Sequence, residues 1–120
     1  MSAIAPFPAD PSSVTGARHF VADSLTADGC PYATVETAKL LVSELASNAV
    51  LHAHSAFQVS LSQHDHSLTI AVTDQCATQP SPREVTESGG RGLRLVEALA
   101  NDWGVCPRDG GKAVYFRLAC

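Results

Sequence analysis

Residues 44–52, Glu-Leu-Ala-Ser-Asn-Ala-Val-Leu-His, place a carboxylate at Glu44 and an amide at Asn48, four positions apart. Apolar residues recur through this stretch with a helical period, so the two polar side chains are expected on one side of a helix, beside its apolar stripe. Closer to the C-terminus, Gly89-Gly90-Arg91-Gly92 comes directly before Leu93 and another periodic stretch. A polar helix flank combined with glycines that open a second helix is typical of a nucleotide site.

The length and composition of the chain predict a single domain that covers residues 1–120. With 120 residues, 45% of them hydrophobic, the chain can bury most of its apolar surface without disulfides or metals. Eight basic and twelve acidic residues give a net charge of −4 without clusters of one sign, which argues against direct binding of nucleic acid. No apolar run approaches the roughly 20 residues of a membrane span, and no signal peptide is recognisable. We therefore expect a cytoplasmic protein with no membrane partner.

The four cysteines, Cys30, Cys76, Cys106 and Cys120, are far apart in the sequence and form no C-x-x-C pair. A secreted disulfide framework or a zinc site would space them differently. The sequence therefore predicts reduced thiols.

The N-terminal half of the sequence predicts one strand followed by two helices. Residues 3–7 are expected to form a short edge strand that stops at Pro8. Asp10 followed by Pro11 is typical of a helix N-terminus, and Thr34 is expected to cap the second helix. The apolar stripes comprise Val14, Ala17, Val21 and Leu25 in the first helix, and Val35, Ala38, Val42, Leu45 and Ala49 in the second.

Alternation with a period of two begins after Ser55 and indicates strands. We expect an antiparallel hairpin with strands over 57–61 and 68–74, followed by a long loop over 75–88 of the kind that is usually functional. The remaining expected elements are a helix over 93–99, a strand over 103–105, a turn over 109–111 and a strand over 113–118. This order predicts an α+β fold, a two-layer α/β sandwich with helices on one face of a mostly antiparallel mixed sheet.

The residue types on the second helix suit magnesium and proton chemistry. Mg²⁺ prefers oxygen ligands and keeps most of its water, so the amide oxygen of Asn48 together with nucleotide phosphates would make a plausible site. Glu44, one turn earlier, could accept a proton from a hydroxyl group or a water molecule directed at a γ-phosphate. The alternative is that the pair only forms a solvated helix face.

The glycines before Leu93 suit phosphate binding. Exposed backbone N–H groups at the start of a helix, with the positive end of its dipole, can hold an anion, and glycine lets a phosphate approach closely. Gly89, Gly90, Gly92 and the backbone of Leu93 are the candidates. Arg91 could contact the phosphates or a protein partner, and Lys112 could be a phosphate contact or a surface charge.

Asp74 is expected at the end of a buried strand. A carboxylate there needs a hydrogen-bond donor, since burial without a partner is costly. The alternative is an aspartate that only forms a turn.

Taken together, the Glu44/Asn48 pair, Asp74, the glycine-rich loop and the closing hairpin over 110–116 resemble the GHKL ATPase superfamily. Within it, the chain is similar to the small ATP-binding proteins of the anti-sigma-factor serine/threonine kinase type, over essentially its whole length. The resemblance implies a histidine kinase-like ATPase fold, binding of ATP and Mg²⁺, and a flexible ATP lid over about 76–91. It also implies that Asp74 accepts a hydrogen bond from the adenine amino group.

The same resemblance implies a regulatory kinase. Such a protein would use Mg-ATP to phosphorylate a serine or threonine on a small anti-sigma-factor antagonist of the STAS type, could sequester a sigma factor, and could form a homodimer. The alternative is a non-catalytic interaction module with weak or no nucleotide binding. Two positions motivate it: Cys76, where relatives have other residues, and Ala113, where many relatives carry a threonine beside the adenine.

Overall fold

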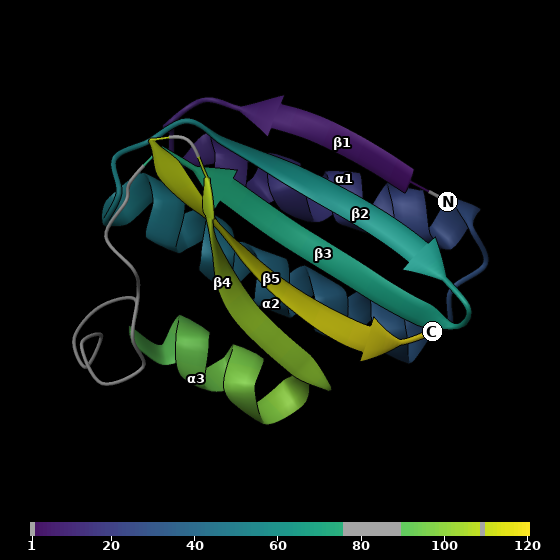
Figure 1. The fold of residues 1–120 in the computed structure, drawn as a ribbon. Coiled ribbons are helices and arrows are strands. Elements are labelled where there is room, and N and C mark those ends of the chain that lie inside the picture. Colours follow the sequence, from purple (N-terminus) through teal and green to yellow (C-terminus); the bar gives the residue numbers. More distant parts are fainter. Residues whose placement is uncertain (1, 76–89, 109) are drawn as a thin grey trace.

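A five-stranded sheet carries helices on one of its faces (Figure 1). The computed structural model describes residues 2–75, 90–108 and 110–120, and for residues 90–93 it describes only the backbone. In sheet order the strands are β1 (Ser2–Phe7), β2 (Phe57–His64), β3 (Ser67–Asp74), β5 (Gly111–Ala119) and β4 (Asp102–Arg108), and every neighbouring pair among them is antiparallel. The described helices are α1 (Ser12–Ala27), α2 (Tyr32–Leu51) and α3 (Gly90–Leu99). The predicted α+β sandwich is confirmed.

The helix starts follow local backbone chemistry. The Asp10 carboxylate accepts hydrogen bonds from the backbone N–H and the hydroxyl of Ser12, so the predicted start of α1 is right to within one residue. The predicted cap at Thr34 is wrong, because α2 begins at Tyr32. Pro31 has an extended backbone with ψ of 147°, so the helix begins directly after it and Thr34 already lies in the first turn.

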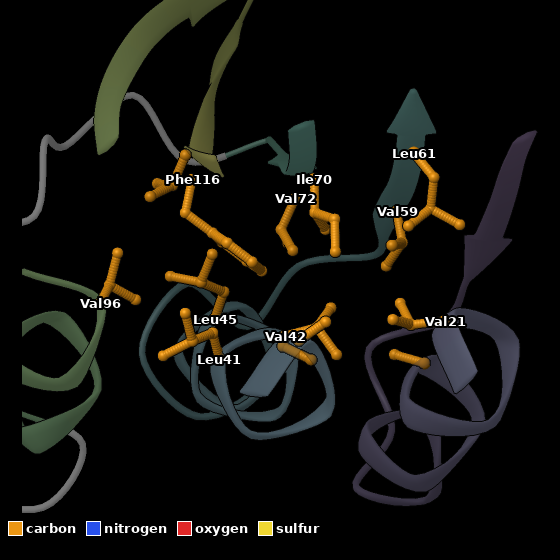
Figure 2. Close-up of a cluster of buried hydrophobic side chains, with 14 of the residues drawn as sticks. Val21, Leu41, Val42, Leu45, Val59, Leu61, Ile70, Val72, Val96 and Phe116 are labelled. Carbon is orange, nitrogen blue, oxygen red and sulfur yellow. The ribbon is translucent and has the colours of Figure 1, made fainter. Parts of the chain in front are cut away.

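The core forms between the sheet and α2, which lies between α1 and α3 (Figure 2). All five residues of the predicted α2 stripe are buried, and the buried face is wider than predicted because α2 has a neighbour on both flanks. Phe116 of β5 is fully buried over α2, and Val96 brings α3 into the same cluster. Deep burial of α2 on several sides holds its polar flank in a fixed position relative to the sheet.

The sheet presents alternate residues to this core. In β2 the predicted residues Phe57, Val59 and Leu61 are all buried, and the ring of Phe7 from β1 stacks on Phe57 at 5.4 Å between centroids. The strands β4 and β5 are longer than predicted. Among the described residues, we find no helix that is both long and apolar enough to cross a membrane.

The cysteines differ from the prediction, because the structure joins Cys30 and Cys120 in a disulfide. Cys30 lies in the connection between α1 and α2. At the C-terminus, the N–H of Cys120 donates to the carbonyl of His66, which lies between β2 and β3. Cys106 is a free, half-buried cysteine, while Cys76 lies outside the described residues. Ninety residues separate the bonded cysteines, so no short spacing in the sequence signals the pair.

Candidate functional site

The second half of α2 carries Glu44 and Asn48 on the flank of its buried face. Both residues are half-buried, whereas Leu45 and Ala49, which follow them directly, are fully part of the core. The helical period therefore gives the arrangement that the sequence predicts, with the carboxylate and the amide one turn apart on the same side. The helix α2 packs against β3, β5 and α3, which are the elements that carry the other candidate residues.

The side-chain oxygen of Asn48 is buried and lacks a hydrogen-bond partner among the described residues. A buried amide oxygen left in this condition costs about 1–3 kcal/mol, so proteins rarely keep one without a reason. A buried oxygen acceptor that no described donor satisfies is suited to a cation, and amide oxygens are among the ligands that Mg²⁺ accepts. The donor chemistry at Asn48 thus fits the predicted metal role.

Asp74, at the end of β3, forms a buried ion pair with Lys112 of β5. The ammonium nitrogen of Lys112 donates to both carboxylate oxygens, at 3.0 Å to Oδ1 and 2.9 Å to Oδ2. Asp74 is 5% and Lys112 is 7% exposed. The sequence predicted that the Asp74 carboxylate needs a hydrogen-bond donor. In the structure the ammonium of Lys112 is such a donor, and Lys112 was itself a candidate phosphate contact.

Sheet register explains why these two side chains meet. Asp74 and Lys112 are direct partners across the β3–β5 ladder, so their side chains lie on the same face. Ala113 is paired with Thr73 instead, and alternation along the strand directs it to the opposite face. The expectation that Ala113 lies beside Asp74, the residue predicted to bind adenine, is therefore wrong, and the residue beside Asp74 is Lys112.

Two residues that the sequence reasoning missed hold the end of β3 in place. The hydroxyl of Ser55 accepts a hydrogen bond from the N–H of Gln75 at 2.9 Å and donates to the carbonyl of Ala56 at 2.6 Å. Gly111 runs so close to β3 that a Cβ there would overlap the carbonyl oxygen of Asp74. A serine shortly before a period-two stretch and a glycine in the turn predicted before the last strand were the available signals.

The glycine-rich segment is only partly described. The predicted opening of a helix by glycines is confirmed, since α3 begins at Gly90 and its first turn includes Arg91, Gly92 and Leu93. Of the predicted lid over about 76–91, residues 76–89, Gly89 included, lie outside the described residues, while residues 90 and 91 are already part of α3. The side chains of residues 90–93 also lie outside the described part. Anion binding by the backbone at the start of α3 stays a prediction.

A surface hollow of about 520 Å³ lies close to the end of β3 but is a different feature. Its lining comes from the ends of β1, β2 and β3 and includes Phe7, Phe57 and Gln75. None of Glu44, Asn48, Asp74 and Lys112 belongs to that lining. We therefore do not include the hollow in the candidate site.

Comparison with known proteins identifies the family. The sequence profile of the histidine kinase-like ATPase domain matches residues 7–118, so the chain belongs to this family. The fold is similar to the crystal structure of the RsbU and RsbW domains of Rv1364c from Mycobacterium tuberculosis, with a TM-score of 0.80 and 18% identity over 99% of this chain and 32% of that one. It is also similar to the histidine kinase domain of a blue-light-activated histidine kinase from Erythrobacter litoralis, with a TM-score of 0.60 and 22% identity over 93% of this chain and 61% of that one.

The chain thus spans about a third of the Mycobacterium protein and less than two thirds of the kinase. At these identities the two structures establish the fold. A comparison with curated protein sequences gives no significant match. An ATPase domain implies nucleotide binding, and the predicted membership in this class of ATPases is confirmed.

Proposed function

We propose that the protein is an ATP-binding regulator that phosphorylates a serine or threonine on a small anti-sigma-factor antagonist. The observation that carries this proposal is the Oδ1 of Asn48, which is buried and has no hydrogen-bond partner in the part of the chain that the structure describes, in a chain that belongs to the histidine kinase-like ATPase domain family. Asn48 would hold Mg²⁺, and the backbone at the start of α3 would receive phosphate oxygens. A bound Mg²⁺ supplies positive charge that stabilises the transferring phosphoryl group.

In this proposal Glu44 is the general base. The substrate hydroxyl oxygen forms a bond to the γ-phosphorus while the bond between the γ-phosphorus and the β,γ-bridging oxygen breaks, which yields ADP and a phosphorylated side chain. Glu44 takes the hydroxyl proton as the new bond forms. Its half-buried position on α2, one turn before Asn48, would keep the carboxylate close to the phosphate end of the site.

The proposed partners follow the same reasoning. The RsbU and RsbW domains of the Mycobacterium structure belong to one protein. For the present chain we propose a STAS-type antagonist as the substrate. A sigma factor and a second copy of this chain are the further partners that we propose. The proposal places the protein in the cytoplasm. In that compartment, disulfides are mostly transient or redox-sensing, so the Cys30–Cys120 bond would form there only under oxidising conditions.

Calorimetry and phosphate transfer test the proposal. We expect purified protein to bind ATP only with Mg²⁺ present, and Asn48→Ala to lose this Mg-dependent binding. Glu44→Gln should bind ATP normally but lose transfer of labelled γ-phosphate to a co-purified antagonist by about 100-fold or more. Glu36→Gln, an exposed substitution earlier on α2, is the matched control. Absence of Mg-dependent ATP binding in the wild-type protein would refute the proposal.

A second candidate is the non-catalytic interaction module. The observation that favours it is the ion pair between Lys112 and Asp74, because the aspartate expected to bind adenine already has a charged partner. Transfer of phosphate from ATP to a partner, with loss of transfer in Glu44→Gln, would exclude this candidate. ATP binding without any transfer to a range of antagonists would favour it.

A further inference from the structure

The ammonium of Lys112 holds both oxygens of the carboxylate that would anchor adenine, at 2.9 and 3.0 Å. We propose that Lys112 is a built-in competitor at the base end of the nucleotide site, so that the ammonium must leave Asp74 before the amino group of adenine can bind there. This inference rests on the proposed function, since it takes ATP as the ligand. It assigns to Lys112 control of nucleotide affinity in place of the predicted contact to phosphate.

The competing contact is built into the sheet. Asp74 and Lys112 are partners in the β3–β5 register, and the close approach of Gly111 to the Asp74 carbonyl keeps the two strand ends together. Neither residue belongs to the segment that precedes α3. The ion pair therefore forms whenever the sheet forms, independently of any movement elsewhere in the site.

The chemistry of the two donors favours Lys112 over adenine. Lys112 is a cation that meets an anion in a buried place, whereas the adenine amino group is a neutral donor. Both would donate to an ionised carboxylate, but only the ammonium adds the attraction between opposite charges, which is weakly screened in a buried place, and a buried ammonium removed from its partner must find another acceptor. The form of the protein that can bind adenine is therefore a minor one, and the apparent dissociation constant rises in inverse proportion to its population.

Substitution of Lys112 tests this directly. Lys112→Met keeps most of the side-chain bulk without the charge, and Lys112→Thr replaces it with a small side chain whose hydroxyl can still donate to Asp74. We expect both variants to bind Mg-ATP about tenfold more tightly than the wild type, or better, in calorimetry. Lys39→Met is the matched control, because Lys39 forms an exposed pair with Glu36 in the first half of α2, and its affinity should equal that of the wild type.

A second measurement needs no substitution and covers the case in which the variants do not fold. The chain has two lysines, Lys39 and Lys112, so the side-chain ¹³Cε signals of lysine-labelled protein can be assigned without overlap. We expect the Lys112 signal to shift on addition of Mg-ATP as the ammonium leaves Asp74, while the Lys39 signal stays in place. Circular dichroism of each variant establishes which of them are folded.

The outcomes separate this inference from the proposed function. If the wild type binds Mg-ATP but folded Lys112 variants bind it no more tightly, the competitor role is wrong and the proposed function stands. Weaker binding by the variants would make Lys112 a ligand contact, which also overturns the inference, as would an unchanged Lys112 signal at saturating ATP. If neither the wild type nor any variant binds ATP, both proposals fail. Binding that is detectable only in the variants supports the competitor role and at the same time refutes the proposed kinase function of the wild-type protein.

Discussion

Gly111 approaches Asp74 so closely that a Cβ on Gly111 would overlap the Asp74 carbonyl oxygen and would also lie 2.8 Å from the Cα of Gln75. Both obstacles are backbone, which cannot rotate away as a side chain can. We therefore expect Gly111→Ala to force the ends of β3 and β5 apart and to lower the free energy of unfolding by about 2–4 kcal/mol. Urea denaturation measures the change. Ala119→Ser, an exposed substitution on the same strand, should change stability by less than about 0.5 kcal/mol, and equal stability of Gly111→Ala and wild type would contradict the expectation.

Ser55 supports the same strand end from the other side. Its hydroxyl is the acceptor for the N–H of Gln75, and the residue is only 8% exposed. Ser55→Ala leaves this N–H without its acceptor, so we expect a loss of about 1–3 kcal/mol in the free energy of unfolding. The exposed Ser62→Ala on β2 is the control, with an expected change within about 0.5 kcal/mol. The hydrogen-exchange rate of the Gln75 amide should rise in Ser55→Ala, and an unchanged rate would show that another acceptor replaces the hydroxyl.

The Cys30–Cys120 disulfide joins residues separated by 90 positions. In the chain-entropy view a closed loop of this length restricts the unfolded chain strongly, and such bonds contribute about 2–5 kcal/mol. We expect dithiothreitol to lower the melting temperature of the wild type and to leave that of Cys30→Ser unchanged. Cys106→Ser should respond to the reductant like the wild type. The same melting temperature with and without reductant would mean that the bond adds no stability.

The helices and strands were predictable because their signals are local. The stripe that includes Val42 and Leu45 fixes the buried face of α2, and with it the side on which Glu44 and Asn48 lie. The alternation that ends at Asp74 likewise fixes the face on which its carboxylate is buried. These features depend only on the helical and strand periods, so a single sequence is enough to predict them.

The pairing of residues across the sheet was not predictable in the same way. Lys112 and Asp74 are 38 positions apart, and a shift of the register by one residue would direct Ala113 to Asp74 in its place. The predicted place of Ala113 is wrong by this one residue. The disulfide was missed for a related reason, since only the folded chain brings Cys120 to Cys30.

The ion pair between Asp74 and Lys112 should couple the two residues in stability. Removal of one partner of a buried pair leaves an uncompensated charge and typically costs about 3–5 kcal/mol, whereas removal of both costs less. We expect Lys112→Met and Asp74→Asn each to destabilise the protein, and the double variant to be more stable than the sum of the two losses predicts. A double-mutant cycle from urea denaturation measures this coupling. Purely additive losses would show that the pair contributes no interaction of its own.

Unlike the ion pair, Asn48 should contribute little to the stability of the ligand-free protein, because its side-chain oxygen is buried and has no partner among the described residues. Asn48→Ala removes an unsatisfied acceptor together with a few packing contacts, and these effects act in opposite directions. We therefore expect the free energy of unfolding without ligand to change by less than about 1 kcal/mol, while the stabilisation that the wild type gains from Mg-ATP disappears. Thermal denaturation with and without Mg-ATP separates the two effects. A large loss of stability without ligand would show that Asn48 maintains the fold of α2 and is not reserved for a cation.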